Sequence, residues 1–177
     1  MLHGLVDRPL IFTMDDVRRF PSESYIYFLE CSGNPEYKKP YGKTASDLVG
    51  LVSCAEWTGV SLKLVLQEAG LQPGAKWVVA EGADAAAMTR SIPIEKCLDD
   101  AMLVYSQNGE RLRPQQGYPL RLLVPGFEGG VGVSSDDYQF GIAERNSNER
   151  RLFRSSTSVE ALQPGAWSKS IQLETRA

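Results

Sequence analysis

The chain has 177 residues, a formal net charge of −3 and a pI near 5.3, and 42% of its residues are hydrophobic. This length and composition are typical of one globular domain with a sizeable core, and the acidic balance without a basic stripe excludes a nucleic-acid-binding surface. No run reaches the roughly 18 apolar residues of a membrane helix, and the N-terminus lacks the charged and apolar regions of a signal peptide.

The first half of the chain alternates short elements with polar connections. The patterns predict, in chain order, a strand at residues 10–13, a helix at 16–20 capped by Thr13, a strand at 25–31, a long polar loop at 34–46, and an amphipathic helix at 61–69 that is capped by Ser61 and ended by Gly70.

The second half continues in the same way. We expect a strand at 77–80, a loop at 81–84, an extended segment at 90–93, a helical turn at 93–98, a strand at 102–105, a hairpin turn at Asn108-Gly109, and an apolar strand within 117–126 that is interrupted by Arg121. The elements follow no β-α-β rhythm, and the sequence contains neither a GxGxxG nor a Walker motif. The pattern therefore favours a mixed-sheet α+β fold.

The strand at 25–31 leads Cys31 into the turn Ser32-Gly33-Asn34. Glycine and asparagine tolerate tight or left-handed turns, so we expect the thiol to be held from behind and open in front. A thiolate in this position is a natural ligand for a soft metal, or a nucleophile if a base lies near. The alternative is a cysteine buried at a strand end, because free cysteine is among the most often buried residues.

The other candidate nucleophiles and ligands are few. Cys31, Cys54 and Cys97 form no CxxC pair, so we expect no zinc site, and a disulfide between two of them is allowed but not required. His3 is the single histidine, which leaves little basis for Ser-His or Cys-His catalysis. We assign Cys54 and Cys97 no function and expect the chemistry to come from a cofactor.

The order of several motifs resembles the molybdopterin-binding domain of the sulfite oxidase family. The matching segments include HGLVDRP (3–9), ECSGN (30–34), EWTGV (56–60), NGE (108–110) and YPLRLLVPG (118–126). Within that family the chain most resembles the molybdenum subunit of bacterial sulfane (sulfite) dehydrogenase. Each motif alone is weak, but their order around ECSGN, over residues 3–130, is specific.

The resemblance implies a molybdenum-molybdopterin cofactor (Mo) whose metal is bound by the thiolate of Cys31. It also implies that Asp84 hydrogen-bonds the pterin, that Arg121 binds the cofactor's phosphate, and that Gln116 contacts the cofactor. Glutamine at this last position is typical of the sulfane dehydrogenase branch. From the residues alone, a turn aspartate is the favoured interpretation of Asp84, and Arg121 could equally pair with a buried carboxylate.

The chain departs from the family pattern in four places. It lacks the upstream Arg/His-containing segment, and Glu36 stands in a loop where sulfite oxidases place arginines. Ser134 replaces a phosphate-binding lysine, and in the tail the expected active-site tyrosine aligns near Val159, with no dimerisation domain after it. We therefore expect a truncated molybdopterin-binding domain at residues 1–133 and a diverged tail of the same domain at 134–177.

Two functions follow from these observations. The first is a molybdenum oxidoreductase that oxidises sulfite or a protein-bound sulfane sulfur by oxygen-atom transfer and passes electrons to a cytochrome c subunit. The second is a non-catalytic module that binds the cofactor weakly or not at all. By resemblance we expect a periplasmic protein, although the sequence shows no export signal, and we expect no nucleic-acid partner and no membrane span.

Overall fold

The computed structural model describes residues 1–31, 44, 50–82, 89–129, 134–135 and 138–143. Its strands are β1 (Leu2–Gly4), β2 (Ser22–Glu30), β3 (Val52–Ser61), β4 (Trp77–Gly82), β5 (Thr89–Pro93), β6 (Met102–Gln107), β7 (Glu110–Arg111), β8 (Leu120–Leu123), β9 (Ser134–Ser135) and β10 (Tyr138–Ala143). Its helices are α1 (Met14–Val17), α3 (Leu62–Ala69) and α4 (Ile94–Asp99), with a 3₁₀ turn, η1, at Pro114–Gln116. The α+β class predicted from the sequence is confirmed.

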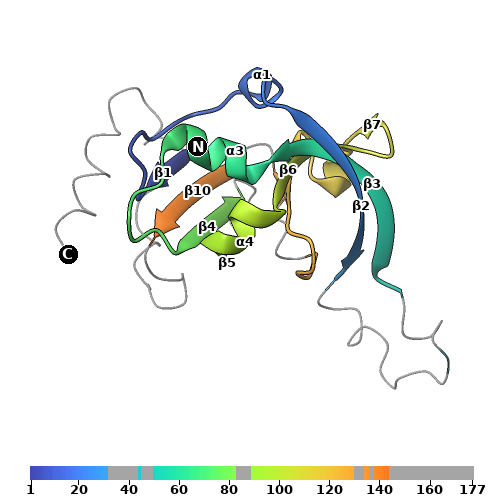
Figure 1. Cartoon of the computed structure of the whole chain (residues 1–177). Helices are drawn as coiled ribbons and strands as arrows, with labels where there is room; N and C mark the ends of the chain where they lie inside the picture. The colour runs from blue at the N-terminus through green and yellow to red at the C-terminus, as the bar shows by residue number, and fades with distance from the viewer. Residues whose placement is uncertain (32–43, 45–49, 83–88, 130–133, 136–137, 144–177) are drawn as a thin grey trace.

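The strands form two sheets. The smaller has the order β1-β10-β4-β5, in which β1 runs parallel to β10 and the other neighbours are antiparallel. The larger has the order β2-β3-β6-β8-β9, is antiparallel, and carries β7 beside β6. Strands β2 and β3 extend from the rest of the molecule as a long curved ribbon (Figure 1). No helix in the described part of the chain is long and apolar enough to cross a membrane.

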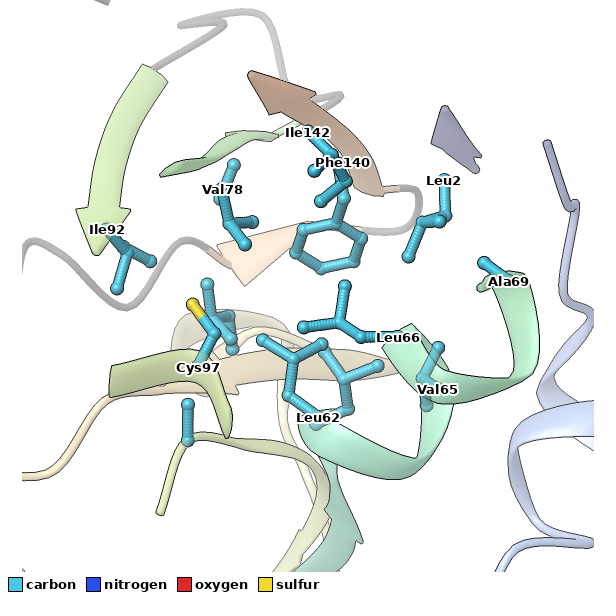
Figure 2. Packing of buried hydrophobic residues seen from close by; sticks show 14 of the residues in the cluster. Leu2, Leu62, Val65, Leu66, Ala69, Val78, Ile92, Cys97, Phe140 and Ile142 are labelled. Atoms are coloured by element: carbon cyan, nitrogen blue, oxygen red, sulfur yellow. The ribbon is translucent and has the colours of Figure 1, made fainter. Parts of the chain in front are cut away.

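The main core lies between the smaller sheet, helices α3 and α4, and one face of the larger sheet. Leu62 and Leu66 of α3 point toward Phe140 of β10, with Val78 and Ile92 beside them (Figure 2). All five side chains are buried, as expected for an amphipathic helix packed on a sheet. The apolar pattern at 61–69 predicted this helix, and Gly70 ends it with a φ of 75°.

The opposite face of the larger sheet carries a second, smaller cluster, because alternate residues of a strand point to opposite faces. Its buried members are Ala55, Trp57, Met102, Val104, Leu112 and Leu123, and the half-buried Tyr27 and Leu29 pack against them. We refer to this side as the second-cluster face. Leu103 and Leu122, the neighbours of these residues in sequence, belong to the main core instead.

The turn after β8 contacts β2, the terminal strand of the larger sheet. The N–H of Cys31 donates to the Leu51 carbonyl, so Cys31 and Leu51 form a hydrogen-bonded pair of the β2–β3 ladder. In an antiparallel ladder such pairs alternate with pairs that are not hydrogen-bonded, so the N–H and C=O groups of Glu30, which lies opposite Val52, point away from β3. The outward carbonyl of Glu30 accepts the N–H of Gly129 at 2.6 Å. The chain after β8 therefore reaches the outer edge of β2.

Three sequence-based predictions need correction. The strand at 10–13 is wrong: Leu10 forms only an isolated bridge with Leu2. The first helix begins at Met14, because Thr13 and Asp16 form a capping box that starts it directly after Thr13. The sequence analysis also missed β3, since Ser53, Cys54 and Glu56 leave part of this strand without an apolar face. The loop predicted at 34–46 lies outside the described residues except for Thr44.

Replacement of Gly59 should destabilise the fold. Gly59 follows a register shift between β3 and β6, and a Cβ atom at this position would overlap the Leu103 carbonyl and the Val104 backbone. We expect Gly59→Ala to lower the free energy of unfolding by about 1–3 kcal/mol, as overpacking does. Denaturant titration measures this, with Ser53→Ala on the exposed part of the same strand as the control. Equal stabilities of the two variants would contradict the prediction.

Burial of Cys97 should make stability depend on pH in the alkaline range. Burial raises the pKa of this thiol from 9.0 to about 12, and the nearby Glu95 adds to the effect. Above pH 9 the unfolded chain loses the thiol proton while the folded chain keeps it, so stability falls as pH rises from 9 toward 12.

Between these limits, we expect the difference in unfolding free energy between wild type and Cys97→Ala to fall by up to about 1.4 kcal/mol per pH unit. Denaturant titrations at a series of pH values test this, and a difference independent of pH would contradict it.

Candidate cofactor-binding site

Arg121 is the centre of the candidate site. It lies opposite Val104 in the β6–β8 ladder, and this register places it on the second-cluster face. The guanidinium is part-buried: Nη1 donates to the Gln116 carbonyl at 3.1 Å and Nη2 to the Gly129 carbonyl at 3.4 Å. Its Cζ atom lies 5.6 Å from the ring centroid of Trp57, within the range of a cation–π contact. The guanidinium thus has three partners: two main-chain carbonyls and the ring of Trp57.

Trp57 contributes a polar atom as well as a surface for Arg121. The side chain is 2% exposed, and its Nε1 has no hydrogen-bond partner among the described residues. A buried indole N–H usually finds an acceptor, because leaving it unpaired is costly. The ring itself belongs to the second cluster. Its position beside Arg121 was missed, although it lies in the EWTGV motif.

Cys31 lies at the end of β2 and its side chain is exposed. The alternative of a buried strand-end cysteine is therefore wrong. Its N–H continues the ladder to Leu51, so the strand alternation places Cys31 on the same face as Tyr27 and Leu29, which is the second-cluster face. Burial, with the negative charge of Asp100 nearby, raises the pKa of Tyr27 and keeps its phenol neutral.

Gly129 connects Arg121 with the strand end that carries Cys31. Its carbonyl accepts from Arg121 Nη2, and its N–H donates to the carbonyl of Glu30, the residue before Cys31. One peptide unit thus bridges the arginine and β2. No local pattern other than the glycine pair at residues 129–130 indicates this role.

The turn that carries Gly129 is also attached to α4. Within the turn, the Phe127 N–H donates to the Val124 carbonyl at 3.2 Å. Lys96 Nζ lies 5.8 Å from the ring centroid of Phe127 and 2.6 Å from Asp100 Oδ1. The contact between Lys96 and Phe127 thus joins the turn to α4, the helix whose Ile94 and Cys97 belong to the main core.

Gln116 meets Arg121 through its main chain. Its carbonyl accepts from Arg121, while its side-chain Oε1 accepts the N–H of Arg113 at 2.9 Å and stabilises turn η1. The oxygen end of this amide is therefore used within the turn, and its NH₂ end is the part that can donate to a ligand. The structure thus brings Gln116 and Arg121 together, as the sequence analysis expected of two residues of one site.

The remaining predicted site residue, Asp84, lies outside the described residues, between β4 and β5. Glu81, at the end of β4, has its pKa raised by burial. Ser134, which the sequence analysis aligned with a lysine of the family pattern, lies directly opposite Arg121 in the β8–β9 ladder. Ser134 is thus the cross-strand neighbour of the arginine.

The side chains of the site suit an anionic ligand that carries a metal ion and supplies most of the metal's ligands itself. A part-buried guanidinium and an unpaired indole N–H are both donors, and a bidentate arginine is suited to phosphate. An exposed thiol is a ligand for a soft metal. The described residues contain no group of three or more His, Cys, Asp or Glu that could hold a metal ion. Within the described residues, the second-cluster face therefore offers the Cys31 thiol and an anion site, the two kinds of group that a metal–pterin ligand requires.

A cavity of about 140 Å³ lies elsewhere, between α1 and the main core. It is lined chiefly by apolar side chains, among them Phe12, Met14 and Phe140, and neither Cys31 nor Arg121 lines it. Its chemistry offers nothing for a metal or an anion, so we do not include it in the site.

The chain matches the oxidoreductase molybdopterin-binding domain family over residues 1–134. It is similar to the sulfane dehydrogenase SoxCD from Paracoccus pantotrophus, a solved structure, with 41% identity, a TM-score of 0.76, and coverage of 82% of this chain and 38% of that chain. It is also similar to NADH nitrate reductase 1 of Phaseolus vulgaris (33% identical; 93% of this chain, 21% of the relative) and the NADH nitrate reductase of Spinacia oleracea (37% identical; 93% and 20%). The chain thus spans about a fifth of these curated relatives.

Replacement of Arg121 by lysine should destabilise the fold although the charge is kept. Lysine has no planar fork to reach two carbonyls at once, so we expect a loss of about 1–3 kcal/mol in the free energy of unfolding. Denaturant titration measures this, with Arg113→Lys as the control, because Arg113 is 70% exposed. If both variants are as stable as the wild type, the contacts of Arg121 with Gln116 and Gly129 do not hold the site together.

Proposed function

The chain belongs to the oxidoreductase molybdopterin-binding domain family, and from this membership we propose that it binds a molybdenum-molybdopterin cofactor and supports oxidation of a sulfur substrate. The observation that carries the proposal is the bridge through Gly129, which ties the anion-binding group of Arg121 to the strand end that presents Cys31. The two groups that the cofactor needs, a phosphate partner and a thiolate, are thereby held on one face of one sheet.

Each residue of the site has a separate role in this proposal. Cys31 provides the thiolate ligand, Arg121 binds the cofactor's phosphate, and Trp57 fixes the guanidinium by its ring and donates its N–H to the bound group. Gln116 orients Arg121 through its carbonyl, and Asp84 accepts hydrogen bonds from the pterin. When bound, the cofactor supplies two-electron oxygen-atom-transfer chemistry, while the protein binds and orients it.

The sulfur substrate rests on the comparison with the sulfane dehydrogenase. That chain is 41% identical, whereas the two nitrate reductases are 33% and 37% identical. We propose sulfite or a protein-bound sulfane sulfur as the substrate, a cytochrome c subunit as the electron acceptor, and the periplasm as the location. The acidic Glu36, which follows Cys31 closely in the sequence, favours a substrate less anionic than sulfite.

One observation favours the second candidate function, a module without catalysis. Ser134 stands beside Arg121 in the β8–β9 ladder where the family pattern has a phosphate-binding lysine. One positive charge fewer at the anion site weakens phosphate binding, since the attraction of the two cations for the phosphate adds. A chain that binds the cofactor too weakly to keep it would have the fold of the family without its activity.

Metal analysis of protein produced in a molybdopterin-competent host tests the proposal. We expect near-stoichiometric molybdenum in the wild type and in Cys54→Ser, and a loss of at least tenfold in Cys31→Ser. Cys54 is the matched control because its side chain is also exposed and lies on the strand next to β2. Wild-type protein that is folded but free of molybdenum would support the non-catalytic module. Equal metal in Cys31→Ser would remove Cys31 from the metal site.

Activity assays with sulfite, thiosulfate and nitrate then separate the substrate classes. We expect cytochrome c reduction with a sulfur compound and no turnover of nitrate with a reduced dye. Turnover of nitrate alone, by a molybdenum-loaded protein, would contradict the sulfur substrate and leave the cofactor assignment intact.

A further inference from the structure

The outer edge of β2 carries main-chain groups that no described residue uses. β2 is the terminal strand of the larger sheet, and the bond from Cys31 N–H to the Leu51 carbonyl fixes which of its residues face β3. Counting back from Cys31, every second residue of β2 is hydrogen-bonded to β3 through its main chain. The N–H and C=O groups of the residues between them, Ser24, Ile26 and Phe28, therefore point outward. None of them has a hydrogen bond to a described residue, whereas the outward carbonyl of Glu30 is bonded to Gly129.

Apolar side chains border this edge. Ile26 is 71% exposed and Phe28 is 57% exposed, and they lie on the face opposite the second cluster. The β2–β3 ribbon extends beyond the helices that cover this face of the sheet elsewhere (Figure 1). An exposed, apolar edge strand of this kind is a template for pairing with another strand, and proteins usually protect such edges with charges, prolines or bulges. Between Ser24 and Leu29 the edge has none of these.

We propose that this edge pairs with the same edge of a second copy of the chain. The two β2 strands run antiparallel, and the two-fold axis that relates the copies passes between their Ile26 residues. The segment Tyr25-Ile26-Tyr27 reads the same in both directions, so the two-fold axis places each Tyr25 opposite Tyr27 of the other copy. Two hydrogen bonds join the Ile26 residues, and two more form in each flanking Ser24–Phe28 pair, because these residues have their main-chain groups outward.

The charges allow this register. Glu23 comes to lie opposite Leu29 of the second copy, and Glu30 lies outside the paired segment because its outward carbonyl is bonded to Gly129, so no two carboxylates face each other across the interface. The aromatic Tyr25–Tyr27 pairs are favourable cross-strand neighbours. A two-fold interface requires a self-complementary patch, and this segment provides one in both main chain and side chains.

The interface is independent of the cofactor site. The bond between Gly129 and Glu30 occupies the end of the edge next to Cys31, so pairing stops before the thiol. Ile26 and Phe28 also lie on the face opposite that of Arg121. The dimer is therefore expected with or without bound cofactor, and its test does not depend on molybdenum.

Sedimentation velocity and light scattering, from low micromolar to several hundred micromolar chain in the presence of a reductant, measure the mass. We expect the wild type to approach twice the chain mass as concentration rises. Ile26→Pro removes the outward N–H at the two-fold axis and no hydrogen bond to β3, so we expect the mass of one chain at every concentration. Circular dichroism confirms that the variant is folded.

A second pair of variants makes the result decisive if proline disturbs the strand. Ile26→Lys places two like charges at the axis and should also give a single chain, while Ile11→Lys, at another exposed isoleucine, should dimerise as the wild type does. A wild type that stays monomeric throughout overturns the proposal and leaves the edge for a different partner. A dimer that survives both Ile26 variants also overturns it, because its interface then lies elsewhere.

Discussion

A guanidinium group set into an otherwise apolar sheet face is the constraint on which the candidate site depends. Arg121 lies on the second-cluster face among buried side chains, and a cation there needs partners that replace water. It obtains them from both ends of its own strand: turn η1 supplies a carbonyl before β8 and the Gly129 turn supplies one after it. The indole of Trp57 adds the face of a ring. A group held in this way can meet an anion with little reorganisation.

The two faces of the larger sheet differ: one packs into the main core, and the other carries the candidate site. One face belongs to the main core, where Leu103 and Leu122 pack with α3 and the smaller sheet. The other face carries Trp57, Arg121 and the approach to Cys31, with a small cluster beneath them. The side chains of the site are therefore separate from those of the main core, and this separation allows a family to vary its chemistry on a constant fold.

The sequence predicted the elements whose pattern is local and missed those fixed by distant contacts. The helix at 61–69 and the Asn108-Gly109 hairpin were predictable, since spacing and turn residues specify them. β3 was not, because the exposed Ser53, Cys54 and Glu56 interrupt its apolar residues. Resemblance selected Cys31, Gln116 and Arg121. Nothing local could show that a glycine far along the chain lies beside Glu30, since that contact exists only after β8 has paired.

That glycine contact also has a consequence for how the protein is made. The β2–β3 ribbon is built from nearby segments, but the bond between Gly129 and Glu30 closes a loop that contains most of the fold. Closing such a loop costs chain entropy that only the completed sheet offsets, so this bond should be among the last to form. An emerging chain would then present its cysteine before its arginine is in place. Insertion of a bulky prosthetic group would have to wait for the whole domain to leave the ribosome.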